Sequence, residues 1–135
     1  MGKRFEEIEH TADVAIRVRG RDLAELFVNA AYGLACQLSD PDALDLTIEQ
    51  EIELEAYDAE TLLVSWLGEL LYLSERDECV LADFDVLEIA STRLRAVARG
   101  GPVQGHRRHV KAVTFSEMEI VRVGGGYETT VVFDV

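Results

Sequence analysis

The sequence predicts an α+β domain in which two helices pack on one face of a mostly antiparallel or mixed β-sheet. Two observations predict this class: apolar residues recur every three or four positions in two segments, and every second position in the others. The expected order is strand, helix, strand, helix and then four strands. The chain has 135 residues, of which 48% are apolar, and this fits one compact domain over residues 1–135.

The first predicted strand and helix follow one another closely. The large apolar residues Val14, Ile16 and Val18 alternate with Asp13, Ala15, Arg17 and Arg19, as expected for a strand with one buried face. Asp22, with Glu25 three residues later, resembles a capping box at a helix start. An apolar stripe with the helical period follows, and the Asp40-Pro41 turn is expected to end the helix. This helix is therefore predicted to face the core.

The second strand and helix show the same pair of patterns. Residues 47–57 alternate apolar side chains with a row of glutamates. Because residues on one face of a strand stand about 6–7 Å apart, we interpret the row as a solvated face and not as a cation site. Asp58 is expected to cap the second helix, in which leucines and Trp66 form a wide apolar face. Trp66 is therefore assigned to the core and not to a cofactor site.

Four further strands are predicted at residues 80–89, 92–99, 110–123 and 127–135. The last two are joined by Gly124-Gly125-Gly126, which favours a hairpin because glycine accepts positive φ. Alternation in the last strand continues to Val135, so we expect this end of the sequence to be ordered in the sheet. Residues 105–109 are expected to form a polar loop.

Charge and composition exclude several classes of function. Asp and Glu number 26 against 13 Lys and Arg, and the net charge of −13 argues against tight binding to nucleic acid or anionic lipid. Cys36 and Cys79 lack metal-binding or redox spacing, which favours reduced thiols. The sequence contains neither a secretory nor a membrane-spanning apolar run, so we expect a cytoplasmic protein without a membrane partner.

The basic residues are unevenly distributed. Residues 91–111 contain six of the thirteen and no acid. This stretch has two interpretations: a docking surface for an acidic protein or for phosphates, and a solvated hairpin.

Two acids near predicted strand ends form a candidate metal site. Asp13 precedes the first strand, and Asp134 is followed by Val135, whose terminal carboxylate adds a further oxygen ligand. Oxygen ligands favour Ca²⁺, Mg²⁺ or Mn²⁺ over Zn²⁺, because the chain has no convincing thiolate or imidazole set. The alternative is a local one: Asp13 caps a turn, and Asp134 belongs to a frayed terminus.

Lys111 offers a second way to bring these acids together. Two neighbouring carboxylates repel unless a cation or a basic side chain lies between them. The Lys111 ammonium is therefore expected either beside the acids or at the sheet edge, where lysines snorkel into water.

Catalysis has weaker support, since His10 and His109 are candidates for an acid and a base but no known catalytic motif is present.

Four blocks in this order resemble the archease family. They are Glu9-His10-Thr11-Ala12-Asp13, residues 61–72, residues 110–115, and Val132-Phe133-Asp134-Val135. The resemblance spans almost the whole chain. It implies a protein that is not an enzyme itself but activates an RtcB-type RNA ligase, the GTP-dependent enzyme of tRNA splicing and RNA repair. Such an activator promotes guanylylation of the ligase and its multiple turnover.

The resemblance also implies a site. It assigns the metal to Asp13, Asp134 and the Val135 carboxylate, with Lys111 in the same functional set and His10 in the first matching block. Residues 115–116 read Phe-Ser where many members have Tyr-His, so no histidine acts there. Two alternatives stay open: a small divalent-metal-dependent phosphoester hydrolase that uses the same carboxylates, and a chaperone or interaction module whose acids only keep it soluble.

Overall fold

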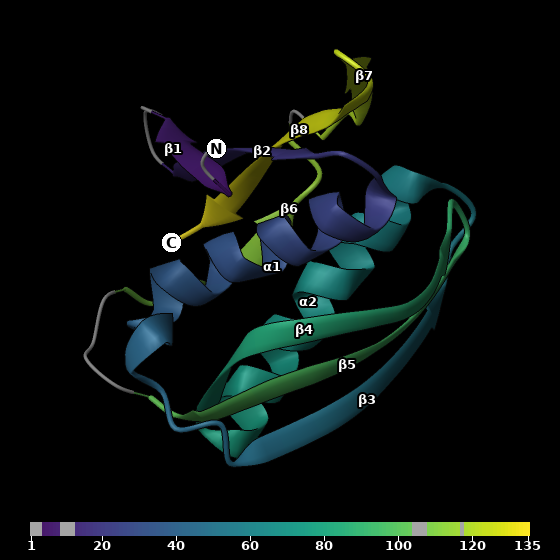
Figure 1. Ribbon diagram of the computed structural model, residues 1–135. Helices are drawn as coiled ribbons and strands as arrows, with labels where there is room; N and C mark the ends of the chain where they lie inside the picture. Colours follow the sequence, from purple (N-terminus) through teal and green to yellow (C-terminus); the bar gives the residue numbers. More distant parts are fainter. Residues whose placement is uncertain (1–3, 9–12, 104–107, 117) are drawn as a thin grey trace.

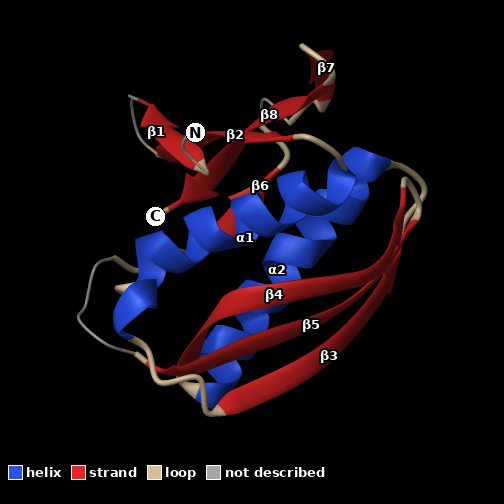
Figure 2. Cartoon of the chain, viewed as in Figure 1, coloured by secondary structure: helices blue, strands red, loops and turns tan. Residues whose placement is uncertain are grey.

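Two helices lie between two antiparallel sheets in this protein (Figures 1 and 2). The computed structural model describes residues 4–8, 13–103, 108–116 and 118–135. The predicted α+β class with two helices is confirmed. The strands, however, divide between two sheets, whereas the sequence predicts a single one.

The first sheet contains five strands in the order β1-β2-β8-β6, with β7 also paired to β8. Its strands are β1 Phe5–Ile8, β2 Val14–Gly20, β6 Ala112–Thr114, β7 Val121–Val123 and β8 Gly126–Asp134. The short strand β1 is not predicted, and the predicted strand 110–123 is interrupted between β6 and β7. A turn separates these two strands, in which the Met118 N–H donates to the Phe115 carbonyl at 3.0 Å.

The second sheet contains three strands in the order β3-β5-β4. They are β3 Ile48–Glu55, β4 Cys79–Ala90 and β5 Arg93–Pro102, and all their pairings are antiparallel. Gly100 lies where the sheet needs a close approach of main chains. A Cβ at this position would meet the Val80 carbonyl oxygen at 1.9 Å, so only glycine fits there.

Acids on both sides neutralise the basic residues of the second sheet. The register places three glutamates of β3 opposite three arginines of β5: Glu49 with Arg99, Glu53 with Arg95 and Glu55 with Arg93. Arg99 also reaches across to β4, where it contacts Asp85 at 2.8 Å. Of the two interpretations of the basic stretch, these pairs favour the solvated one for β5, because its arginines already contact acids of the same sheet. The glutamate row of β3 is solvated as well. Exposed ion pairs of this kind contribute little to stability.

The helices α1 Leu23–Leu38 and α2 Ala59–Asp77 begin where the sequence predicts. The side chains of Asp22 and Asp58 each accept a main-chain N–H of the first turn at 2.8 Å. Helix α1 packs against β2 of the first sheet and β4 of the second, while α2 contacts β3, β4 and β6. The helical layer therefore joins the two sheets. Within the described part of the chain, no helix is long and apolar enough to cross a membrane.

Trp66 stands at the centre of the core, as the sequence predicts. The largest fully buried side chains come from both helices and both sheets, and include Trp66, Phe27, Phe133, Ile16 and Leu94. The Trp66 Nε1–H donates to the Phe27 carbonyl of α1 at 3.0 Å, and its ring meets Phe84 of β4 edge-on at 5.7 Å. One side chain of α2 thus contacts the other helix and the second sheet.

Replacing Asp58 with alanine is expected to lower the melting temperature at pH 7 by an amount that shrinks at low pH. Hydrogen bonds from the side chain and main chain of Thr61 hold the pKa of Asp58 below its ordinary value of 3.8. A lowered folded-state pKa gives stability that is present above about pH 4 and is lost as the pH falls through the folded value. Thermal unfolding at pH 7 and pH 3 tests this.

Asp58→Asn is the matched control, because asparagine also caps helices and does not titrate. It should retain most of the stability at both pH values. A deficit of Asp58→Ala that is the same at pH 3 as at pH 7 would show that the charged cap does not stabilise α2.

Candidate metal centre

The two candidate carboxylates lie at one end of the first sheet. Strand β2 begins directly after Asp13, and β8 ends at Asp134. The register pairs Val14 with Phe133, so its continuation by one residue places Asp13 opposite Asp134. Directly opposed residues of an antiparallel pair share a face, with Cβ atoms about 4.5–5.5 Å apart. The fold therefore brings together two acids from the two ends of the chain.

This pair of acids stands at the boundary between buried apolar surface and solvent. The preceding row on the same face contains Ala15 and Val132, which are opposite one another and fully buried. In the next row outward, Asp13 is half-buried and Asp134 is exposed. Val135 follows Asp134 and is 38% exposed.

Lys111 lies against the same strand end. Its main-chain N–H donates to the Asp134 carbonyl oxygen at 2.7 Å, and the next residue, Ala112, pairs with Asp134 in the register of β6 and β8. The Lys111 side chain is exposed, and no ion pair among the described residues includes it. Of the two expectations for Lys111, this exposure favours the position at the sheet edge.

His10 lies outside the described residues, together with Glu9, Thr11 and Ala12. His109 is described and exposed. The proposed pairing of these two histidines as an acid and a base therefore stays a prediction.

The donor chemistry at this sheet end fits a hard divalent cation. Asp13 and Asp134 supply carboxylate oxygens, and the Val135 carboxylate is adjacent to them in the chain. Among the described residues, no group of three or more His, Cys, Asp or Glu side chains is placed to hold a metal ion. Ca²⁺ and Mg²⁺ accept such mixed oxygen sets.

Thiolate ligands are disfavoured in this fold. Cys79 is buried under α2, and its burial raises the pKa of the thiol, which keeps the sulfur protonated at neutral pH. The expectation of a hard cation and not Zn²⁺ stays a prediction.

A group of arginines at the far end of β2 is a feature that the sequence analysis does not single out. Arg17, Arg19 and Arg21 line a cavity there together with Arg4. Their spacing at every second residue is visible in the sequence. Such spacing is ordinary on a solvated strand, so only the fold shows that these side chains share a cavity.

Comparison with known proteins identifies close similarity over the whole chain. The model of the Archease protein family (MTH1598/TM1083) matches residues 5–135. Protein archease of Methanosarcina mazei is 37% identical over 142 residues, which cover 99% of this chain and 97% of that protein. Protein archease of Methanopyrus kandleri is 38% identical over 138 aligned residues, which cover 97% of this chain and 99% of that protein.

Solved structures agree with this similarity. The solution structure of Methanobacterium thermoautotrophicum protein 1598 has a TM-score of 0.81 and 32% identity, and the match covers 99% of this chain and 100% of that one. The crystal structure of an archease from Thermotoga maritima, described as a possible chaperone, has a TM-score of 0.69 and 23% identity. The match covers 95% of this chain and 94% of that one. The second match is a similarity of fold alone.

Proposed function

The chain belongs to the Archease protein family, and we propose that it is a metal-binding accessory protein that activates an RtcB-type RNA ligase. In this proposal it works in the cytoplasm, has no catalytic activity of its own, and promotes guanylylation and repeated turnover of the ligase in tRNA splicing and RNA repair. One observation supports it most: the β2–β8 register brings Asp13 towards Asp134, the two acids to which the resemblance assigns the metal.

The residues of this site have distinct proposed roles. Asp13, Asp134 and the Val135 carboxylate hold Ca²⁺, Mg²⁺ or Mn²⁺, and the bound cation supplies positive charge for anionic oxygens of the ligase or its nucleotide. Lys111 belongs to the same proposed functional set, with its exposed side chain at the adjoining sheet edge. We also propose that His10 belongs to the functional set, because it lies in the first block that resembles the family.

The surface charge suits a protein that contacts the ligase and not the RNA. A net charge of −13 repels phosphate backbones, so the protein does not compete with the ligase for its substrate. On the second sheet, the arginines of β5 are already paired with acids of β3 and β4. The contacts that activate the ligase are therefore proposed to be protein–protein contacts.

Multiple-turnover RNA joining by the cognate RtcB-type ligase, with RNA in excess and with or without this protein, tests the proposal. We expect several products per ligase molecule with the protein and about one without it. Equal turnover in the two reactions would refute the assignment.

The same preparation separates the two alternatives. A hydrolase would release product from a phosphoester panel without any ligase, in a reaction that depends on divalent metal and on Asp13. A general chaperone or interaction module would show no binding of Ca²⁺, Mg²⁺ or Mn²⁺ that depends on Asp13 in calorimetry.

A further inference from the structure

An open cavity of about 900 Å³ lies at the end of β2 opposite to Asp13. Its charged lining residues are Arg4, Glu6, Arg17, Arg19, Arg21 and Glu25. Of the cavity-lining residues on β2, Arg17 is nearest to Asp13 in sequence, and the four residue steps between them span about 13 Å along the strand. The cavity is thus distinct from the candidate metal centre.

The cavity lies next to the place where the pairing of β1 with β2 begins. The pairing of β1 with β2 starts at Phe5 opposite Val18, whereas β2 continues to Gly20 along β8. Beyond Gly20 the chain turns directly into α1, and a Cβ on Gly20 would meet the Leu26 main-chain nitrogen at 2.3 Å. The cavity lies between the end of β2, the first turns of α1 and the β7–β8 turn.

The lining of this space has a positive charge in a strongly acidic protein. It carries four arginines and two glutamates, an excess of two positive charges, while the whole chain has a net charge of −13. Four of the thirteen basic residues thus share one cavity. Glu128, which pairs with Arg19 from β8, reduces this excess to one positive charge, so the surroundings of the cavity still differ in sign from the protein as a whole.

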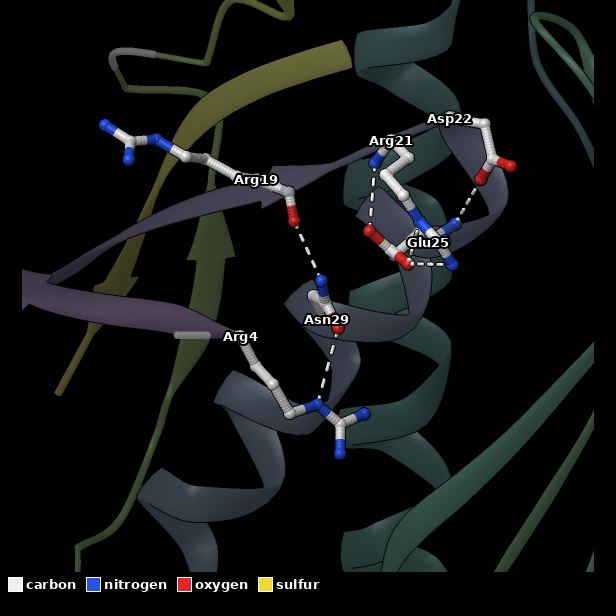
Figure 3. A network of polar contacts seen from close by, with 6 residues as sticks. All are labelled: Arg4, Arg19, Arg21, Asp22, Glu25 and Asn29. Atoms are coloured by element: carbon white, nitrogen blue, oxygen red, sulfur yellow. Dashed lines mark hydrogen bonds and ion pairs between the residues drawn. The ribbon is translucent and has the colours of Figure 1, made fainter. Parts of the chain in front are cut away.

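Protein contacts hold three of these arginines in place. Asn29 of α1 accepts from Arg4 Nε at 3.3 Å and donates to the Arg19 carbonyl at 2.8 Å, so one amide joins both residues (Figure 3). Arg21 Nε donates to Glu25 at 2.9 Å, and Arg19 Nε donates to Glu128. The guanidinium groups of Arg4 and Arg19 use only Nε in these bonds, so their terminal nitrogens remain as donors.

Arg17 has no such partner among the described residues. It is half-buried on β2, between Glu6 of β1 and Thr130 of β8, and no hydrogen bond or ion pair found in the described ranges involves it. A partly desolvated guanidinium has five N–H donors and gains most from an anion that accepts several of them. Arg17 is therefore the side chain of this cavity with the greatest unused capacity for an anion.

We propose that this cavity binds a small anion with two or more linked phosphate groups, held chiefly by Arg17 and Arg19. These side chains lie on the same face of β2 about 6–7 Å apart, a spacing that suits neighbouring phosphates better than one. The planar guanidinium matches phosphate oxygens in pairs. The volume falls in the usual range for small-ligand sites, about 300–1,000 Å³. This site shares no residue with the proposed metal centre and goes beyond the proposed ligase-activating function.

Calorimetry with the full chain tests the proposal, with tripolyphosphate, ATP and orthophosphate as probes at low salt and with EDTA to remove divalent metal. Tripolyphosphate is expected to bind at least ten times more tightly than orthophosphate. The double variant R17Q/R19Q should lose at least tenfold in affinity for tripolyphosphate. Its matched control is R93Q/R95Q, which removes the same charge from the second sheet and should change the affinity less than twofold.

Further arms keep the test decisive. Arg17→Lys retains the charge but not the planar fork, so it should also weaken binding; it replaces the double variant if that one does not fold. Asp13→Asn should leave binding unchanged, which separates this site from the metal centre.

ATP that binds more tightly than tripolyphosphate identifies a nucleotide as the source of the phosphates, and equal affinity identifies the phosphate chain alone. An equal loss in R93Q/R95Q, or no binding of tripolyphosphate at millimolar concentration, would overturn the proposal.

Discussion

Replacing Asp134 by asparagine is expected to abolish stimulation of the RNA ligase and to leave the fold intact. The substitution keeps the size of an exposed side chain and the main-chain bond that Lys111 donates to residue 134, but it removes one of the carboxylates proposed to hold the cation. Asp13→Asn should have the same effect from the opposing strand. We expect at least a tenfold drop in products per ligase molecule, since a divalent site with so few protein ligands depends on each one.

Asp45→Asn is the matched control for charge, because Asp45 is exposed in the connection before β3, a strand of the other sheet. It should retain full stimulation. A Gly-Ser extension after Val135 removes the carboxylate from that residue and should weaken metal binding in calorimetry. If Asp134→Asn folds normally and still stimulates the ligase, Asp134 is not a ligand and the proposed metal centre is wrong.

Replacing Trp66 by alanine is expected to cost about 3–5 kcal/mol of unfolding free energy, the usual range for removing a buried aromatic side chain. The indole is fully buried, contacts Phe84, and donates the hydrogen bond that the Phe27 carbonyl accepts. The total free energy of unfolding of a single domain is only about 5–15 kcal/mol, so the variant should be marginally stable. Urea unfolding followed by circular dichroism measures the difference.

Trp66→Phe separates packing from hydrogen bonding. It keeps an aromatic ring between α2 and β4 but removes the indole N–H, so its cost should be clearly smaller than that of the alanine variant. If Trp66→Ala unfolds at the same urea concentration as the parent, the contacts of this side chain do not hold the helical layer to the second sheet.

The elements that the sequence predicts well are those whose signals are local. Asp22 and Asp58 cap helices because the acceptor and the N–H groups it binds are only three residues apart. Trp66 is placed in the core by the apolar period of its own helix. Strand alternation correctly predicts β2 and β8, because each of them has one face towards the helices.

The structure differs from the sequence prediction where strand pairing decides which residues form a strand. Strand β1 has only four residues, too few to show a clear period, and it exists because β2 offers an edge for pairing. The segment 110–123 is strand-like throughout, yet β6 and β7 pair with separate parts of β8. The register between Ala112 and Asp134 does not continue to the pair Val121 and Glu128, so the chain between them must leave the sheet.

The sequence by itself determined the kinds of residue at the candidate sites: the carboxylates of Asp13 and Asp134, the lysine near them, and the arginines at alternate positions of β2. Only the tertiary structure decided which of them meet. The β2–β8 register begins at Val14 and Phe133, next to Asp13 and Asp134, the fold places Arg17 and Arg19 beside a cavity, and the β3–β5 register neutralises Arg99 with Glu49. The physical reason is that periodicity and capping act between near neighbours, whereas register is a property of two strands from distant parts of the chain.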